Sequence, residues 1–295
     1  MLPIGLRLAS AGGRRHAARV TVAISLIGFG EAAQAFAGGA GWSARGYDIA
    51  DREADFARLG VTATRDNAGA LAGAPLVLGL VTAASALAAA RDAVPHLATG
   101  ALWCDMNSVA PATKRAAAAV IDAAGGRYVD CAVMAPVHLL RRDVPILLAG
   151  PHAAAGAEAL AAAGFSAVSV VAGPVGSAAA IKMVRSVMVK GIEALTAECL
   201  LAAHRAGVTD EVLASLGPDW AAKADYNLDR MLAHGTRRAD EMDEVVATLT
   251  DLGIDPLMSR GTASRQRALG AIGSPPLRLA AKLALIDRDK RQPAA

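Results

Sequence analysis

The segment VAISLIGFGEAAQAFAGG, residues 22–39, decides the fold. An apolar run of strand character gives way to Gly28-x-Gly30-x-x-Ala33, and an Ala-rich helix follows. In this strand–turn–helix context the first glycine permits a tight turn, the second lets a pyrophosphate approach the backbone, and a small third residue allows close packing. Free N–H groups at the start of the helix then hold the phosphates. The segment therefore predicts a dinucleotide-binding loop; the alternative is a plain tight turn in a hydrophobic protein.

An acidic residue further along supports the first interpretation. Asp48 stands twenty residues after Gly28, at the end of the second predicted strand. A carboxylate there hydrogen-bonds the ribose hydroxyls of NAD and repels the additional phosphate of NADP, so NAD is favoured over NADP as the cofactor. Glu31 lies where a negative charge suits the helix macrodipole, and its main role is expected to be capping. The candidate cofactor residues of this region are Gly28, Phe29, Gly30, Glu31, Ala32, Ala33 and Asp48.

Strand-like and helix-like segments alternate through about residue 172. This alternation implies a mainly parallel sheet covered by helices on both faces. After Gly176 only helices are expected, one of them more than twenty residues long. We therefore predict an α/β plus all-α protein with a Rossmann-type doubly wound parallel sheet. Its parts are a disordered tail (1–19), an NAD(P)-binding domain (20–172) and an all-helical substrate and dimerisation domain (173–295). The predicted strands are 20–27, 44–49, 61–64, 75–81, 101–105, 128–133, 144–148 and 167–171.

Composition sets outer limits on function. The chain has 295 residues, 54% apolar but only 3% aromatic, and its net charge of +3 is too mild to indicate a nucleic-acid partner. The sequence has no uninterrupted apolar run of about 18–20 residues, the length that a membrane-spanning helix needs. Cys104, Cys131 and Cys199 are expected to be buried, reduced thiols of a cytoplasmic protein. Metal-binding spacings of histidine or cysteine are absent from the sequence, so no metal is expected.

A second group of residues lies just after the predicted domain boundary. Lys182, Ser186 and Lys190 are spaced four residues apart in a predicted helix, which places them along one stripe. Glu193 returns to the same face but lies about 16 Å from Lys182 along the axis, too far to be its partner. Burial lowers the pKa of a lysine and fits it for proton transfer near neutral pH. We therefore expect Lys182 to be catalytic; the alternative is a lysine that reaches solvent.

Four segments together carry a family resemblance. They are GFGEAA at 28–33, DMNSVAP at 105–111, DCAVMA at 130–135, and Gly176-x-Ala178-x-x-x-Lys182. Over roughly residues 20–250 the chain resembles the β-hydroxyacid dehydrogenases, the group that contains 6-phosphogluconate and 3-hydroxyisobutyrate dehydrogenases. The segment at 237–266 resembles a bacterial subgroup of that family with its own C-terminal domain.

The resemblance implies a mechanism and further site residues. Lys182 takes the role of the lysine that removes a proton from a substrate hydroxyl while hydride passes to the nicotinamide. Val81 and Thr82 would flank the nicotinamide, and Ser108 would contact the substrate carboxylate or the carboxamide. A homodimer is also implied, in agreement with the long apolar helix that begins near Lys182.

The chain departs from the family pattern at two places. Ser186 replaces an asparagine, and a serine hydroxyl has a shorter reach. Met134 and Ala135 replace the Ser-Gly pair that holds the substrate carboxylate, and a thioether donates no hydrogen bond. Other candidates for anion binding are Arg185, His138, Arg141, Arg142, Arg237 and Arg238, although a solvated surface role is favoured for each. His204 and His234 are isolated histidines.

The favoured function is an NAD(P)-dependent dehydrogenase or reductase that acts on a small hydroxy acid or a related carbonyl. A second hypothesis keeps the fold but changes the chemistry to imine reduction or oxidative decarboxylation; the presence of Lys182 argues against the imine reductases. A third is a dinucleotide-binding protein without catalysis. The candidate site residues beyond the glycine loop are Lys182 and Ser186 (catalytic), Val81 and Thr82 (cofactor), and Ser108, Met134 and Ala135 (substrate).

Overall fold

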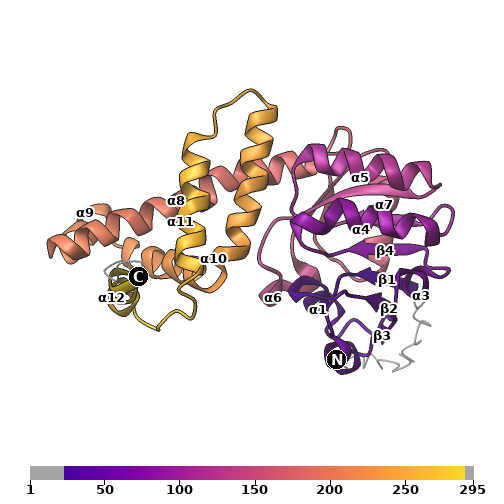
Figure 1. Ribbon diagram of the computed structural model, residues 1–295, viewed down its shortest axis with the longest axis horizontal. Helices are drawn as coiled ribbons and strands as arrows, with labels where there is room; N and C mark the ends of the chain where they lie inside the picture. The colour runs from indigo at the N-terminus through magenta and orange to yellow at the C-terminus, as the bar shows by residue number, and fades with distance from the viewer. Residues whose placement is uncertain (1–22, 290–295) are drawn as a thin grey trace, which may run out of the picture.

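The computed structural model describes residues 23–289 and has two parts, a twisted sheet covered by helices and a group of long helices beside it (Figure 1). Within these residues the sheet has eight strands in the order β3-β2-β1-β4-β5-β6-β7-β8. All neighbouring strands run parallel except β6 and β7, which pair antiparallel. The strands are β1 Ala23–Ile27, β2 Ser43–Tyr47, β3 Thr62–Ala63, β4 Leu76–Gly79, β5 Leu102–Asp105, β6 Arg127–Val133, β7 Ile146–Ala149 and β8 Val168–Val170.

Each predicted strand is present, usually one or two residues shorter than expected. The central strands β4 and β5 are buried along their whole length, as expected for a parallel sheet with both faces covered. Residues 20–22 of the first predicted strand, the predicted tail 1–19 and residues 290–295 lie outside the described part of the chain.

Helices cover both faces of the sheet. Phe36 of α1 (Glu31–Ala37) and Leu160 of α7 (Ala153–Ala162) pack in one core cluster against strands β1, β4 and β6. On the opposite face, Ala90 of α4 (Ala86–Ala93) and Ile121 of α5 (Pro111–Ala123) pack in a second cluster with Trp103 and Tyr128. The predicted two-faced α/β arrangement is confirmed.

Several short helices were not predicted from the sequence. They are α2 Glu53–Leu59, α3 Asn67–Leu71 and α6 Val137–Leu140. The polar stretch at 65–67 is interpreted most simply as a turn, but the Asp66 carboxylate accepts a hydrogen bond from the Gly69 N–H at 2.8 Å and begins α3. An Asx cap can therefore start a helix of only five residues.

The C-terminal part is helical between Ser177 and Asp289. Helix α8 (Ser177–Ala206, 30 residues) leads away from the sheet, and α10 (Trp220–Asp251) and α11 (Leu257–Gly270) lie against it as an adjacent pair (Figure 1). At their crossing a Cβ on Gly235 would lie 2.3 Å from the Gln266 carbonyl oxygen, so glycine permits the close approach of α10 and α11. Helices α9 (Thr209–Leu216) and α12 (Leu279–Asp289) complete this part.

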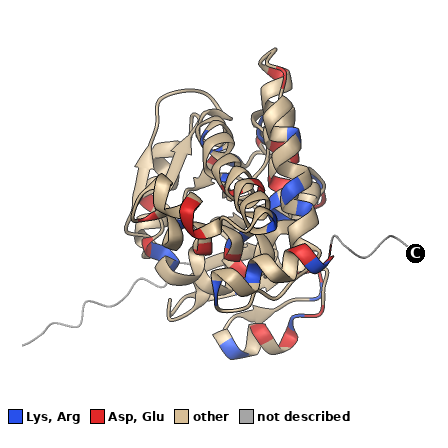
Figure 2. Ribbon diagram, turned by 90° about the vertical axis from the view of Figure 1, so that its left-hand side faces the viewer, with Lys and Arg blue, Asp and Glu red and all other residues tan. Residues whose placement is uncertain are grey.

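Surface properties agree with the mild net charge. Basic and acidic residues are interspersed along the helices rather than gathered on one basic face in the view of Figure 2. None of the helices between residues 23 and 289 is long and apolar enough to cross a membrane.

The expectation of three buried cysteines was wrong for one of them. Cys104 and Cys131 are buried, but Cys199 is exposed, on a side of α8 that borders an open pocket.

Candidate functional site

The glycine loop combines a tight turn at Gly28 with open space at Gly30, at the start of α1. Gly28 has φ +89°, and a Cβ there would lie 2.5 Å from the Leu80 carbonyl oxygen, so no other residue fits. Around Gly30, by contrast, no atom lies within 4 Å of the Cβ position, and no side chain caps α1 at this residue. Open space beside unpaired helix N–H groups fits a phosphate. Ala33 is fully buried against the sheet, as its predicted packing role requires.

Asp48 holds this loop from the end of β2. One of its carboxylate oxygens accepts a hydrogen bond from the Phe29 N–H at 2.6 Å, and the other accepts one from the Ala50 N–H at 2.8 Å. The structure therefore brings Asp48 against the glycine loop, as the spacing predicted. Val81 lies beside Gly28, with its Cγ1 2.9 Å from the Gly28 Cβ position. Thr82 is exposed, and its hydroxyl donates to Ser85 at 3.0 Å.

Lys182 and Ser108 meet although 74 residues separate them. The lysine Nζ donates a hydrogen bond to the Ser108 Oγ at 2.5 Å, and both side chains are half-buried. Burial lowers the pKa of Lys182 to about 8; the charge of Glu241 opposes this change, while the cations Lys190, Lys114 and Arg237 add to it. An amine with this pKa beside a hydroxyl can accept or donate a proton near neutral pH.

A carboxylate in the sheet, that of Asp130, holds the helix that carries Lys182. Asp130, at the centre of β6, is fully buried, and its Oδ2 accepts hydrogen bonds from the N–H groups of Gly176, Ala178 and Ala179 at 2.9, 3.0 and 3.2 Å. These three groups form the start of α8. A negative charge at a helix N-terminus is stabilised by the helix dipole. The carboxylate therefore holds the helix that carries Lys182.

A buried lysine joins this support to the Ser108 loop. Lys114 of α5 is fully buried, with its Nζ 3.1 Å from a carboxylate oxygen of Asp105 and 3.7 Å from one of Asp130. Asp105 also accepts hydrogen bonds from the Tyr128 hydroxyl at 2.5 Å and from the Asn107 N–H at 2.9 Å. Lys114 thus links β5, which leads to Ser108, with β6, whose Asp130 holds the start of α8.

A further ion pair lies beneath Lys182 in the helical part. The Lys190 Nζ donates to a carboxylate oxygen of Glu241 on α10 at 2.7 Å. Burial opposes ionisation of Glu241, but the charges of Lys190 and Lys182 outweigh it and lower the pKa of Glu241 to about 2. Burial also lowers the pKa of Lys190, against the effect of Glu241. The four-residue spacing predicted the position of Lys190 on this stripe of α8, but no sequence pattern indicated its partner Glu241.

Glu31 does not cap α1 as expected. Its carboxylate instead lies 3.8 Å from the His138 Nδ1 and 3.6 Å from an Arg237 nitrogen. These contacts point the carboxylate across the loop toward α6 and α10, away from the N–H groups of its own helix. Glu31 therefore connects the glycine loop to the helical part of the molecule.

The other predicted residues of this region make contacts of their own. The Ser186 hydroxyl donates to the Lys182 carbonyl oxygen at 2.9 Å, so its proton is used within α8. Met134 and Ala135 follow β6 and are half-buried; the Met134 N–H donates to the Pro145 carbonyl at 2.9 Å. Arg185 lies close enough to donate to the Met134 carbonyl at 3.5 Å. Neither Met134 nor Ala135 offers a side-chain donor to a carboxylate.

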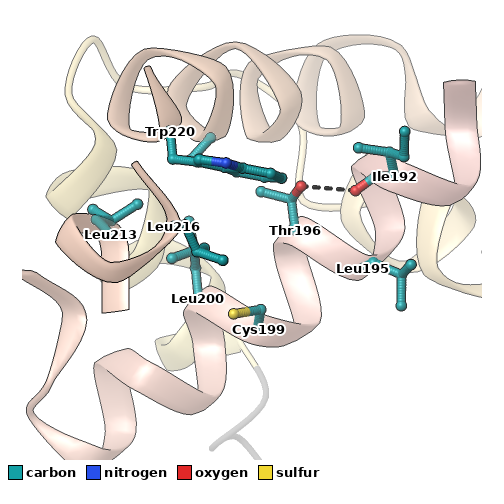
Figure 3. A pocket seen from close by; sticks show the side chains of 9 residues that line it. Ile192, Leu195, Thr196, Cys199, Leu200, Leu213, Leu216 and Trp220 are labelled. Atoms are coloured by element: carbon teal, nitrogen blue, oxygen red, sulfur yellow. Dashed lines mark hydrogen bonds between the residues drawn. The ribbon is translucent and has the colours of Figure 1, made fainter. Parts of the chain in front are cut away.

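Two cavities lie elsewhere on α8. A pocket of about 210 Å³ between α8, α9 and α10 is lined by apolar side chains such as Leu200, Leu213 and Trp220, with Cys199 at its edge (Figure 3). A groove of about 610 Å³ runs between α8 and α11. The α8 residues of both begin at Val187, beyond Lys182 along the helix, so neither cavity contains the candidate catalytic lysine.

Comparisons with known proteins give the relatives of this chain. Residues 203–269 match a family model described as a domain of unknown function (DUF1932). A conserved hypothetical protein from Sinorhizobium meliloti 1021 is 40% identical; the match covers 91% of this chain and 96% of that one, with a TM-score of 0.71. The conserved protein MTH1747, described as structurally similar to 3-hydroxyacid dehydrogenases, is 32% identical, with 84% and 97% covered and a TM-score of 0.67.

More distant structures share the fold. The 3-hydroxyisobutyrate dehydrogenase of Mycobacterium tuberculosis, solved with L-serine, is 16% identical, with 92% of this chain and all of that chain covered and a TM-score of 0.71. Other solved chains of this fold, at 17–18% identity, hold NADP+ or NADPH.

Proposed function

We propose that this chain, which belongs to the β-hydroxyacid dehydrogenase family, is an NAD(P)-dependent oxidoreductase that interconverts a small hydroxy acid and the corresponding carbonyl compound. The observation that carries the proposal is the contact between Lys182 and Ser108. It supplies a titratable amine beside a hydroxyl, on a helix held by the carboxylate of Asp130. The glycine loop and Asp48 would hold the cofactor, and the Glu31–Arg237 contact connects this loop to the helical part.

When bound, the nicotinamide supplies the hydride acceptor or donor. Lys182 supplies the matching proton step: its neutral amine accepts the proton of the substrate hydroxyl as the carbon is oxidised, and its ammonium returns a proton to the carbonyl oxygen in reduction. Ser108 orients the amine by accepting its hydrogen bond. Since the pKa of Lys182 is about 8, we expect oxidation to accelerate as the pH rises through 8, and reduction to be favoured below it.

The experiment that tests the reaction class is nicotinamide absorbance across a panel of small hydroxy acids and their carbonyl counterparts, with NAD and NADP in parallel. Turnover on any member that depends on Lys182 supports the proposal. No turnover on the whole panel, with cofactor binding intact, would favour a dinucleotide-binding protein without this activity, or a substrate without a carboxylate.

A preference for NAD over NADP follows from Asp48. Its carboxylate lies at the end of β2, where a second negative charge from the 2′-phosphate of NADP is unfavourable. We expect NADH to bind more tightly than NADPH, and Asp48→Asn to reduce the difference between them. A fluorescence titration of both cofactors measures this; tighter binding of NADPH by the unmodified protein would overturn the assignment.

Homodimer formation is proposed from the apolar face of α8. Val184, Met188 and Leu195 are 50%, 64% and 55% exposed and follow one side of the helix beside the groove against α11. Exposed apolar side chains at this density are typical of an interface. We expect a dimer by sedimentation analysis, and Met188→Glu to shift it toward monomer. A monomer at micromolar concentration would contradict this.

A further inference from the structure

Helix α10 separates its charges between two sides. Arg230, His234, Arg237 and Glu241 recur at intervals of four, three and four residues, which places them within roughly 60° of arc. Arg237 contacts Glu31 at 3.6 Å and Glu241 pairs with Lys190 at 2.7 Å, so this stripe faces the glycine loop and α8. The other side is acidic and already paired with α11 and α12, through Asp225, Asp229, Asp240 and Asp243.

Arg230 is the unusual member of the stripe. Arg230 is only 9% exposed. Yet among residues 23–289 no carboxylate lies within 4.0 Å of its guanidinium. The neighbouring Glu193 is already bound by Arg238, and by Gln266 at 2.8 Å. Burial, followed by the charge of Arg238, lowers the pKa of Arg230. A largely buried cation without a counter-ion is destabilising, so an incoming anion is stabilised there.

Arg237 and His234 are free to turn toward the same anion. The two contacts of Arg237, 3.6 Å to Glu31 and 3.8 Å to Glu241, are both longer than hydrogen bonds, and its side chain is 56% exposed. The pair with Glu31, whose side chain is 45% exposed, is of the surface kind that contributes little to stability. Burial and the charges of Arg230 and Arg237 lower the pKa of His234, so its neutral ring offers one N–H donor.

The segment after β6 lacks side-chain donors of this kind. Met134 and Ala135, the residues after β6, have no side-chain donor for a carboxylate. The stripe runs along α10 from Arg230 to Glu241, whose charge acts on Lys182. Guanidinium groups bind carboxylates and phosphates through two parallel hydrogen bonds.

We propose that Arg230, His234 and Arg237 form an oxyanion site on the side of α10 that faces the glycine loop and α8, and that they bind the carboxylate or phosphate of the substrate in place of the residues after β6. As a substrate site it rests on the proposed function; as an anion site it does not. Because Glu31 belongs to the glycine loop, the same oxyanion chemistry could come from the cofactor pyrophosphate, and the test separates the two sources.

The test measures binding without turnover. Inorganic phosphate, acetate and succinate are titrated by calorimetry at low ionic strength into the full chain and into its complex with NAD, and NAD is titrated separately. The variants are Arg230→Met and Arg237→Met. The control is Lys223→Met, which removes one positive charge from the same helix at an exposed position with a side chain 58% exposed. In parallel, NMR follows the protonation of His234.

We expect Arg230→Met and Arg237→Met to weaken anion binding by roughly 10- to 100-fold, the range for hydrogen bonds to a charged group, and Lys223→Met to change it less than about twofold. Glu31→Gln should tighten binding, because it removes the carboxylate that competes for Arg237. A bound anion should raise the pKa of His234.

The cofactor titrations then identify the source. Unchanged NAD affinity in the arginine variants indicates the substrate group, and a parallel loss of NAD affinity indicates the pyrophosphate. Anion affinity that is the same in Arg237→Met, Glu31→Gln and the unmodified protein overturns the site, even if Arg230→Met does not fold. Absence of turnover on every hydroxy acid would overturn only the proposed function.

Discussion

Two lysines near the start of α8 lie in opposite surroundings. Lys114 is fully buried between the carboxylates of Asp105 and Asp130, 3.1 and 3.7 Å away. Lys182 is half-buried, and its hydrogen-bond partner is a neutral hydroxyl, that of Ser108. Lys114 has two carboxylates at close range. Lys182 is desolvated, and Glu241, the carboxylate that raises its pKa, is already paired with Lys190.

This difference separates a structural lysine from a chemical one. Two carboxylates and two backbone carbonyl oxygens hold the Lys114 side chain in place, which suits a residue that joins β5, β6 and α5. An incompletely balanced lysine can change protonation at a modest free-energy cost. The same kind of substitution at the two positions should therefore have different outcomes.

The largest effect is expected from Lys182→Ala. Loss of a general acid/base lowers turnover by about 10²–10⁴-fold, while affinity for the dinucleotide changes little because the glycine loop is untouched. Steady-state kinetics and cofactor titration measure the two quantities, with Lys223→Ala on the exposed side of α10 as the control. Full activity in the Lys182 variant would remove the lysine from the mechanism.

Lys114→Met should destabilise the fold by about 3–5 kcal/mol, because it leaves two carboxylates in the interior without their cation. Chemical denaturation at pH 7 gives the free energy of unfolding. A change below about 1 kcal/mol would mean that the Asp105–Lys114–Asp130 group contributes little to stability.

Lys182→Met should change the free energy of unfolding in the opposite direction. We expect it to stabilise the protein by about 1–2 kcal/mol at pH 7, a value discounted for the partial exposure of the side chain. The pKa of Lys182 is about 8 in the fold and 10.5 when unperturbed, so below pH 8 the folded protein holds a charge that the unfolded chain holds more easily. The advantage of the variant should disappear as the pH rises from 8 to 10.5. Destabilisation at pH 7 would contradict the comparison.

The smallest effect is expected from Glu241→Gln. The Glu241 carboxylate raises the pKa of Lys182, so its removal should move the ascending limb of the pH–rate profile for oxidation downward, by up to about one pH unit. Asp243→Gln, a change on the other side of α10, should leave the profile in place. A shift of the limb to higher pH would show that Glu241 acts on the lysine in some other way.

Much of this fold could be predicted from local patterns. Apolar runs such as 75–81 and the helical segments between them specify the parallel sheet, because strands buried on both faces have a distinctive sequence. Gly28, Gly30 and Asp48 could be located because the turn and strand end that they form are local. The short helices around β3 and β6 could not, since four to seven residues carry too little periodicity.

The residues of the candidate site also fall into those with a local sequence signal and those without one. Lys182 was found because it stands at the entrance of an apolar helix, and Lys114 had a comparable signal, a lysine on the face that carries Ala117 and Ile121, which went unused. Glu241 and Arg230 gave no such signal, because their importance comes from contacts with α8 and the glycine loop, formed only when α10 packs there. Glu31 was misjudged for the same reason: the helix dipole is local, but its partners His138 and Arg237 are not.

The most direct test of the central claim is the pH dependence of the reaction of Lys182 with an amine-specific reagent, used in trace amount on the full chain and quantified by mass spectrometry of the Lys182 peptide. The account predicts a midpoint near pH 8. A midpoint near 10.5, the ordinary value for lysine, would contradict it and return Lys182 to the status of a lysine that merely reaches solvent.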